Sequence, residues 1–278
     1  GSFTLSNTSN TIDTLLTAST LGGLTLNNSL ALNVGEITST DAVTIVNTAA
    51  LTLMSGQGIT TTSGNIVLAG TKFTNFAGAN ALNVATGFNW QVWSANPTPL
   101  SPVNGDRNGN LPNDYIQYGA TYGSSAVLGT GNGLLYTYAP VITGQLVGPI
   151  TKHYDGTDSV VLTPSNIAIT GLLDGDVVTI TQTTNSHYTS IGTGSTSIIG
   201  VGTNKTVEVN GVIVTAVNVN TNKTIYGYVF SSPTLSGVGD ITKAPVTLTM
   251  SKTYDANTNF TTANTYNITG TVNGDVVT

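Results

Sequence analysis

Residues that commonly perform catalysis or hold metal ions are sparse in this chain. It has no cysteine, which excludes a thiolate metal site, and its two histidines, His153 and His187, lie in different parts of the sequence. A zinc site built on them would need carboxylates to complete its ligand set. A later copy of the motif around His153 carries Thr253 at the matching position, which indicates a variable position. We therefore expect neither histidine to act as a metal ligand or a catalytic base.

Carboxylates are the other source of catalytic chemistry, and the first part of the chain offers few of them. Enzymes with a parallel β-helix fold cut acidic polysaccharides with clustered acidic and basic residues. Before residue 105 the charged residues are Asp13, Glu36, Asp41 and Lys72, and no two of the acids lie two or three residues apart. The sequence therefore predicts a protein that is not an enzyme, with a polysaccharide-degrading β-helix as an alternative.

Residues 104–114 carry side-chain oxygens at alternate positions, as calcium-binding loops do. The pattern lacks the distal bidentate glutamate, and Arg107 adds an opposing charge. A plain surface loop is the favoured interpretation, calcium is the alternative, and no other cofactor is expected. The four candidate calcium ligands are Asp106, Asn108, Asn110 and Asp114.

Two further acidic turns raise the same question. Asp174 and Asp176 flank Gly175, and Asp275 follows the pair Asn273-Gly274. Such Asp-Gly and Asn-Gly pairs favour hairpin turns because both residues tolerate a positive φ angle. These turns supply fewer than the six or more oxygens that calcium prefers, so we predict hairpins rather than metal sites.

Aromatic residues concentrate between Phe88 and Tyr138. They resemble a platform on which sugar rings could stack. The favoured interpretation is a cap, because the last coil of a solenoid exposes apolar side chains and unpaired strand edges that must be covered. The candidate ligand contacts in this segment are Trp90, Trp93, Tyr118 and Tyr122.

Composition indicates the elements that must position these residues. Only 7% of the residues are charged, the net charge is -6, and Thr, Asn, Ser and Gly dominate the polar remainder. Val, Ile and Leu occur in short alternating runs, which predicts an all-β fold. The seven Lys and Arg residues are scattered along the sequence, so no nucleic-acid partner is expected. No apolar run is long enough to cross a bilayer, so no membrane insertion is expected.

A short period marks the first part of the chain. Leu5, Leu24, Val43 and Ile66 open similar runs about 19 to 23 residues apart, and a second set of runs follows at Leu30–Leu32, Leu51–Leu53 and Phe73–Phe76. This spacing predicts one coil of a β-solenoid with inward aliphatic side chains stacked between rungs. Four asparagines recur near the coil ends, where stacked amides can pair: Asn27, Asn28, Asn47 and Asn65.

A second period of about 100 residues marks the rest of the chain. The segment Lys152-His153-Tyr154-Asp155-Gly156-Thr157 is echoed by Lys252-Thr253-Tyr254-Asp255-Ala256-Asn257, and residues 171–179 are echoed by 270–278. Two tandem modules are therefore predicted, and alanine replaces the motif glycine in the second copy. The motif residues are Tyr154, Asp155, Gly156, Gly175, Asp176, Tyr254 and Asp255.

These motifs resemble the YDG repeats near the C-terminal end of haemagglutinin-type exoproteins, the large adhesins of two-partner secretion related to filamentous haemagglutinin. The run Trp90-Gln91-Val92-Trp93 and the later Tyr118–Gly123 resemble the segment that precedes such repeats in that family. The resemblance implies an all-β chain in which a right-handed parallel β-helix is followed by small β-sandwich-like modules. The expected domains are β-helix coils at 1–88, an aromatic-rich cap or connector at 89–148, a YDG module at 149–244, and the start of a second, incomplete module at 245–278.

The same resemblance implies the function. The chain is expected to be a rod or stalk segment of a secreted bacterial adhesin, extracellular and held at the cell surface. It would attach to glycans or proteins of host cells, to other bacteria or to the polysaccharide of a biofilm matrix, through many contacts added along its length. The expected export partner is an outer-membrane transporter of the two-partner secretion system. The alternative outside adhesion is a purely structural spacer of a surface filament.

Overall fold

The protein is described here by a computed structural model that covers residues 1–97, 105–173, 175–218, 222–261 and 264–276. About 48% of the chain is strand and about 1% is helix, so the all-β prediction is confirmed. The one helical element in the described ranges is a 3-10 turn, η1, at Pro164–Asn166. Within the same ranges, no helix is long and apolar enough to span a bilayer.

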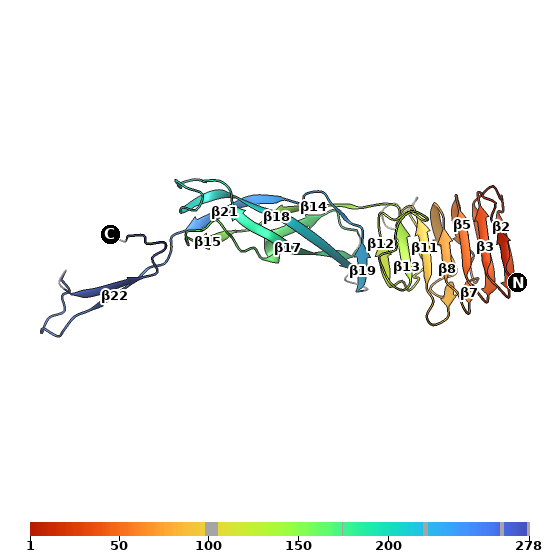
Figure 1. Ribbon diagram of the computed structural model, residues 1–278, viewed down its shortest axis with the longest axis horizontal. Helices are drawn as coiled ribbons and strands as arrows, with labels where there is room; N and C mark the ends of the chain where they lie inside the picture. Colours follow the sequence, from red (N-terminus) through yellow and green to blue (C-terminus); the bar gives the residue numbers. More distant parts are fainter. Residues whose placement is uncertain (98–104, 174, 219–221, 262–263, 277–278) are drawn as a thin grey trace. The chain divides into compact units, whose positions relative to one another are not determined.

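The first part of the chain forms a β-solenoid of about six turns, which confirms the solenoid prediction. One sheet of parallel strands runs in the order β1, β3, β5, β8, β11, β13 (Figure 1). A second sheet runs β10, β7, β4, β6, β9, with β2 also paired to β4. The strands of the first sheet are β1 (Phe3–Leu5), β3 (Leu24–Asn28), β5 (Val43–Asn47), β8 (Ile66–Ala69), β11 (Trp90–Ser94) and β13 (Gly133–Tyr136). Those of the second are β2 (Thr14–Thr20), β4 (Leu32–Ser39), β6 (Ala50–Leu53), β7 (Ile59–Thr61), β9 (Lys72–Asn75) and β10 (Leu82–Val84).

Columns of inward side chains explain the register of the first sheet. Leu24 pairs with Val43, Val43 with Ile66 and Ile66 with Trp90, and each of these residues is buried. Alternate residues of each strand face the core, as the period of two requires. Leu5, expected to align with Leu24, lies opposite Leu26 instead, a shift of two residues that keeps the same side of the sheet.

The second sheet corrects one expected run. Leu32 pairs with Leu51, and Leu51 with Phe73, whereas Leu30 is 45% exposed. Leu30 lies in the turn before β4, where its carbonyl accepts a hydrogen bond from Asn28 Nδ2 at 2.7 Å. The buried run therefore begins at Leu32.

Amide side chains hold one corner of the solenoid. Asn28 lies opposite Asn47 in the ladder, and its Nδ2 donates to Asn47 Oδ1 at 3.2 Å. Both side chains are buried, and Asn47 Nδ2 also donates to the carbonyl of Ala50. The predicted stacking is confirmed for this pair, while Asn27 bonds to the Ser6 carbonyl and Asn65 Oδ1 accepts from the Asn89 amide.

The chain divides into two compact units. The solenoid unit contains Gly1–Ile142, Thr170–Thr179 and Val214–Ser231, and the repeat unit contains the remaining segments Thr143–Ile169, Ile180–Ile213 and Ser232–Thr278. Parts of the predicted module 149–244 thus group with the solenoid. In the solenoid unit the parallel ladder continues past residue 88 through β11 and β13 to β12 (Tyr115–Gln117) and β19 (Lys223–Tyr226).

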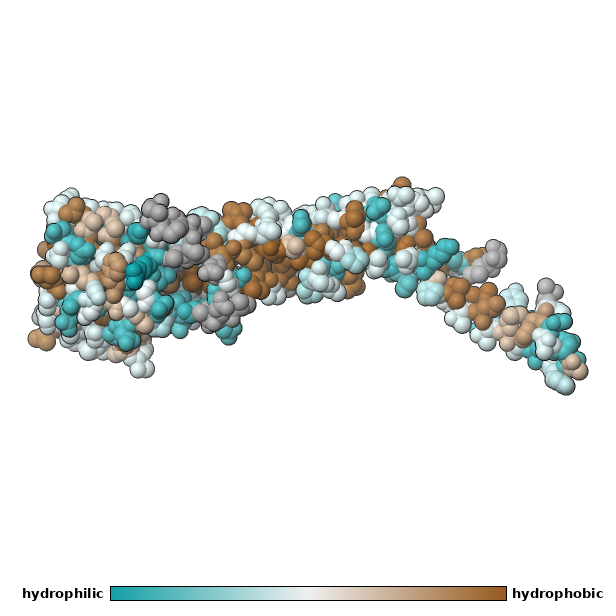
Figure 2. All heavy atoms as spheres, turned by 180° about the vertical axis from the view of Figure 1, so that it is seen from behind, coloured by the Kyte–Doolittle hydropathy of each residue, from teal (hydrophilic) through white to brown (hydrophobic). Residues whose placement is uncertain are grey.

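β18 (Gly202–Asn218) belongs to the repeat unit up to Ile213, and its residues 202–209 pair antiparallel with β21 (Leu235–Thr242). β21 in turn pairs parallel with β15 (Thr151–His153). The second copy of the motif, residues 252–257, lies between β22 (Thr247–Ser251) and β23 (Thr265–Thr269), which pair antiparallel. Figure 2 shows hydrophobic residues gathered on the strands that follow the solenoid. The remaining strands of the chain are β14 (Val141–Leu146), β16 (Ile167–Thr170), β17 (Asp176–Tyr188) and β20 (Val229–Phe230).

Candidate functional site

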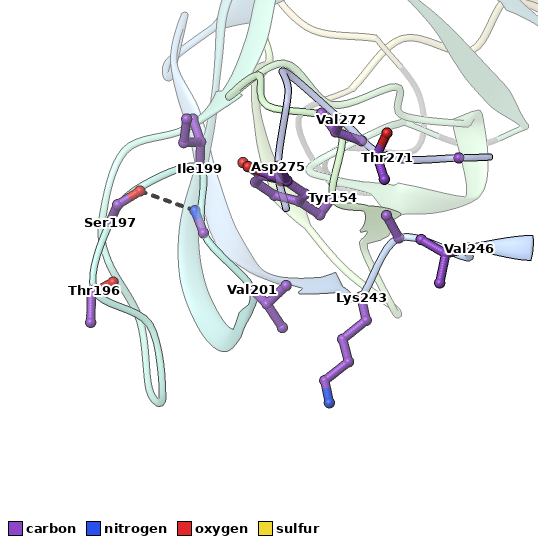
Figure 3. Close-up of a pocket in the computed structure, with 13 residues that line it drawn as sticks. Tyr154, Thr196, Ser197, Ile199, Val201, Lys243, Val246, Thr271, Val272 and Asp275 are labelled. Atoms are coloured by element: carbon purple, nitrogen blue, oxygen red, sulfur yellow. Dashed lines mark hydrogen bonds between the residues drawn. The ribbon is translucent and has the colours of Figure 1, made fainter. Parts of the chain in front are cut away.

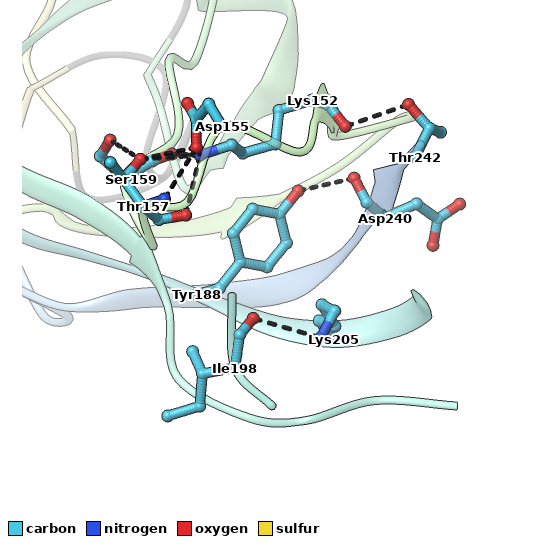
Figure 4. Close-up of polar contacts among 9 residues, drawn as sticks. All are labelled: Lys152, Asp155, Thr157, Ser159, Tyr188, Ile198, Lys205, Asp240 and Thr242. Carbon is cyan, nitrogen blue, oxygen red and sulfur yellow. Dashed lines mark hydrogen bonds and ion pairs between the residues drawn. The ribbon is translucent and has the colours of Figure 1, made fainter. Parts of the chain in front are cut away.

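The first Tyr-Asp-Gly loop encloses the ammonium group of Lys152 (Figure 4). Lys152 Nζ donates to the carbonyls of Thr157 and Ser159 at 3.0 and 2.8 Å, and it lies 2.6 Å from Asp155 Oδ1. The same carboxylate oxygen accepts the Thr157 amide at 2.9 Å. Desolvation raises the pKa of Asp155, but the hydrogen bonds from Lys152 and Thr157 outweigh it and lower that pKa.

The second copy repeats this arrangement around Lys252, with one side-chain acceptor changed. Lys252 Nζ donates to the carbonyls of Asn257 and Asn259 at 3.0 and 2.9 Å and lies 2.7 Å from Asp255 Oδ1. Asn257 Oδ1 accepts from the lysine at 2.8 Å, where the first copy uses Thr157 Oγ1. Since an ammonium group has three donors, the loop saturates the lysine and makes it a structural clamp rather than a nucleophile.

The third position of the Tyr-Asp-Gly motif has left-handed backbone geometry in both copies, although the second copy carries alanine there. Gly156 has a φ angle of 74° and Ala256 one of 64°. The loop therefore requires a positive φ at this position, and alanine adopts it at an energetic cost. The two motif tyrosines differ more, because Tyr154 is half-buried and Tyr254 is 89% exposed.

The Gly175-Asp176 turn is held by tyrosine hydroxyls of the solenoid unit. Asp176 Oδ2 accepts from Tyr228 at 2.6 Å and from Tyr118 at 3.4 Å, while Oδ1 accepts from Asn218 Nδ2 at 2.9 Å. Burial raises the pKa of both tyrosines. Asp176 is 7% exposed, so its oxygens serve protein donors. Asp174, the other acid of this turn, lies outside the described residues.

The calcium candidates have protein partners of their own. Asp106 is 2% exposed, and its carboxylate accepts from the Phe73 amide at 2.8 Å and from Ser94 Oγ at 2.6 Å. Burial raises the pKa of Asp106 to about 7. Asn108 Nδ2 bonds to the Tyr136 hydroxyl, Asp114 Oδ2 accepts the Asn132 amide, and Asn110 is exposed with a φ angle of 59°.

No group of three His, Cys, Asp or Glu residues that could hold a metal ion occurs in the ranges that the structure describes. His153 is exposed, and its Nδ1 lies 2.9 Å from Thr242 Oγ1. His187 lies opposite Ser159 in an isolated antiparallel bridge. The two histidines thus contact β21 and the first repeat loop respectively.

The four aromatic candidates divide into three core residues and one surface residue. Trp90 is 1%, Trp93 5% and Tyr118 5% exposed, whereas Tyr122 is 39% exposed. Trp90 continues the aliphatic column of the solenoid, and Trp93 packs edge-on against Tyr122 with ring centroids 5.6 Å apart. This burial favours the packing interpretation over ligand stacking for the three core residues.

Lys205, a buried residue of β18, has no role that the sequence indicated. It has no exposed surface, and its ammonium donates to four oxygens at 2.5 to 3.1 Å. Figure 4 shows the hydrogen bond to the Ile198 carbonyl. Burial lowers the pKa of Lys205. The acceptors are carbonyls of the 191–198 loop and one hydroxyl, so the lysine anchors that loop; they are Ile191 O, Ser195 Oγ, Ser197 O and Ile198 O.

A pocket of about 490 Å³ lies within the repeat unit (Figure 3). Tyr154, Ile199, Val201 and Val272 supply much of its lining, and Lys243 and Asp275 are its charged residues. Asp275 is the only acid among the described lining residues, so no pair of acids lines this pocket.

Comparisons with known proteins add no relative. No family, curated protein or solved structure matches this chain. The likeness to YDG repeats therefore rests on the motif residues, and the two lysine clamps are the structural feature that accompanies them.

Proposed function

We propose that this chain is a rod or stalk segment of a secreted bacterial surface adhesin of the filamentous-haemagglutinin type. It is extracellular, reaches the surface through an outer-membrane transporter of two-partner secretion, and attaches the cell to host cells, other bacteria or biofilm matrix polysaccharide. The observation that carries the proposal is the matched pair of lysine clamps in a chain that begins as a parallel solenoid.

The physics of solenoids supports a rod or stalk role. Each rung of a solenoid contacts only its neighbours, so the structure extends by adding rungs and its side chains present repeated surfaces. In this proposal the solenoid is a right-handed β-helix and the repeats are β-sandwich-like modules. A chain of many such units would gain avidity by adding weak contacts along its length.

Attachment is tested by coating beads with the purified chain and exposing them to epithelial cells, to bacteria and to surfaces coated with matrix polysaccharide under flow. We expect bead attachment that excess soluble chain removes. Beads carrying the folded chain that attach to none of the three would establish the spacer alternative instead.

The enzyme alternative needs a separate measurement. The chain is incubated with acidic polysaccharides, and the polymer length is followed by size-exclusion chromatography. We expect no shortening, since glycoside cleavage needs a pair of acids and Asp275 is the only acid among the described lining residues of the repeat-unit pocket. Polymer shortening that grows with protein concentration would replace the adhesin by a polysaccharide-degrading β-helix.

A further inference from the structure

The basic residues of the solenoid unit converge although they are scattered in the sequence. Lys72, Arg107 and Lys223 are the only Lys or Arg residues in its three segments. All three line one groove of about 750 Å³. Their spacing in the sequence does not indicate that they share one groove.

Backbone pairing fixes the position of Arg107. Its amide donates to the Phe73 carbonyl at 3.0 Å, and its carbonyl accepts the Asn75 amide at 2.8 Å, so it forms a further parallel rung beside β9. Its guanidinium lies 4.9 Å from the centre of the Phe76 ring. The side chain is exposed, which leaves the charge accessible from the groove.

Lys223 reaches the same groove from β19. Its Nζ donates to Asn113 Oδ1 at 2.6 Å, and desolvation lowers its pKa. A bound anion would offset that desolvation and favour the charged ammonium. Lys72, half-buried on β9, adds the third positive charge.

Two acids lie near the groove cations. Asp106, the only acid among the described lining residues, accepts from Ser94 Oγ and the Phe73 amide and interacts electrostatically with Lys72, while Asp114, outside the lining, interacts with Lys223. Arg107 is the cation with the most exposed side chain. The remaining polar lining is rich in side-chain amides, which both donate to and accept from hydroxyl groups. These amides belong to Asn108, Asn110, Asn113 and Asn218.

We propose that this groove binds an acidic glycan, with Arg107, Lys72 and Lys223 contacting its carboxylate or sulfate groups and the asparagine amides its hydroxyls. The inference rests on the proposed adhesive function and gives it a ligand class and a site. Arg107 supplies the most exposed contact, because guanidinium binds carboxylate and sulfate through two parallel hydrogen bonds.

The chemistry of the groove favours a glycan over nucleic acid. A nucleic acid needs a row of cations along its phosphates, and aromatic faces on which bases can stack. The groove offers three cations and one exposed ring, Phe76, which Arg107 already covers. A glycan with charged groups separated by hydroxyls matches spaced cations with amides between them.

The test measures binding of fluorescent oligosaccharides to the full chain by anisotropy. The probes are polygalacturonate fragments, heparin fragments, neutral dextran and single-stranded DNA of similar net charge. We expect one or both acidic glycans to bind, dextran to bind far more weakly, and the acidic binding to weaken at high ionic strength. Preference for polygalacturonate identifies carboxylate as the recognised group, and preference for heparin identifies sulfate.

Arg107→Gln should weaken acidic-glycan binding about fivefold, the size expected for loss of one accessible ion pair. Lys243→Gln removes an exposed lysine of the repeat unit and serves as the matched control, with binding expected to stay unchanged. Unchanged melting temperatures establish that both variants fold; Arg107→Glu, which reverses the charge, should reduce binding further.

Equal binding of dextran, tighter binding of DNA, or equal losses in Arg107→Gln and Lys243→Gln would overturn the inference. The bead assay separates this failure from failure of the proposed function. Beads that attach while the groove binds no acidic glycan refute the groove alone. A groove that binds the glycan on beads that attach to nothing refutes the adhesive function.

Discussion

Two aspartates, one in each unit, accept hydrogen bonds from backbone amides, but one is buried and the other is exposed. Asp106 in the solenoid unit accepts a strand amide and a hydroxyl while 2% exposed, and burial raises its pKa to about 7. Asp155 in the repeat unit accepts an amide and the Lys152 ammonium with its side chain 53% exposed, and its pKa is lowered. In the solenoid unit a buried carboxyl group thus stabilises the backbone through hydrogen bonds. In the repeat loop a solvent-accessible ion pair does so.

Raising the pH should have the largest effect on the free energy of unfolding. The pKa of Asp106, about 7, lies above its ordinary value of 3.8, so the folded protein keeps a proton that the unfolded chain releases. This contribution is complete below about pH 4 and is lost as the pH rises through about 7, which amounts to about 4 kcal/mol. Urea unfolding at a series of pH values measures it.

Asp106→Asn is the control, because the amide keeps the shape and removes the titration. The free energy of unfolding of this variant should change less between pH 4 and 8 than that of the parent by about the same amount. Asp155 acts in the other direction: its contribution is present above its ordinary pKa and is lost as the pH falls below it. A parent protein as insensitive to pH as the variant would show that Asp106 is ionised in the fold.

A cavity in the solenoid core should have the next largest effect. Ile45 is fully buried in the column between Leu26 and Leu68, so Ile45→Ala should lower the free energy of unfolding by about 3 kcal/mol. Ile213→Ala is the matched control, since Ile213 is 54% exposed and should cost less than about 0.5 kcal/mol. Equal losses in the two variants would refute the stacked core.

Removing the clamp lysine Lys152 should have a smaller effect on the free energy of unfolding. The Lys152 side chain is 11% exposed and bonds to two carbonyls, so Lys152→Gln should lower the free energy of unfolding by about 1 to 2 kcal/mol. Hydrogen exchange of the Thr157 amide should quicken, because Asp155 loses the partner that orients it. Lys252→Gln should quicken exchange at Asn257 alone; a change at Thr157 in that variant would contradict two independent clamps.

The sequence predicts the repeated coils of the solenoid well, but it does not settle the roles of Trp90 and Leu30. Every rung needs an inward aliphatic residue, so the period is visible at Leu24, Val43 and Ile66. Trp90 continues that column, but aromatic residues also line ligand sites, and only pairing with Ile66 distinguishes the two roles. Leu30 is apolar like its neighbours, and only the turn geometry places it outside the core.

The sequence predicts the partners of the charged residues less well. The repeated motif indicated the loops around Asp155 and Asp255, because two copies constrain the same geometry. Lys205 had no such signal, since most of its acceptors are backbone carbonyls that any sequence supplies. The cationic groove had none either, because parallel pairing brings together residues from three distant segments.

Adding a Cβ at the motif glycine Gly156 should have the smallest effect. The second copy of the motif already carries alanine at the matching position, Ala256. Gly156→Ala should lower the free energy of unfolding by about 1 kcal/mol, because φ is 74° there and a Cβ disfavours that region. Ala256→Gly should raise the stability of the second hairpin by a similar amount. Thermal melting measures the first variant, and amide exchange across β22 and β23 measures the second.

The difference between these two variants isolates a contact. A Cβ on Gly156 would meet the Asn273 side-chain amide, whereas the backbone cost is common to both copies. An excess loss in Gly156→Ala over the gain in Ala256→Gly therefore measures the displacement of Asn273. Since that amide is the end of a flexible side chain, we expect the excess to be below about 1 kcal/mol. A much larger excess would mean that the first loop is held against the 272–274 turn rather than by its own clamp.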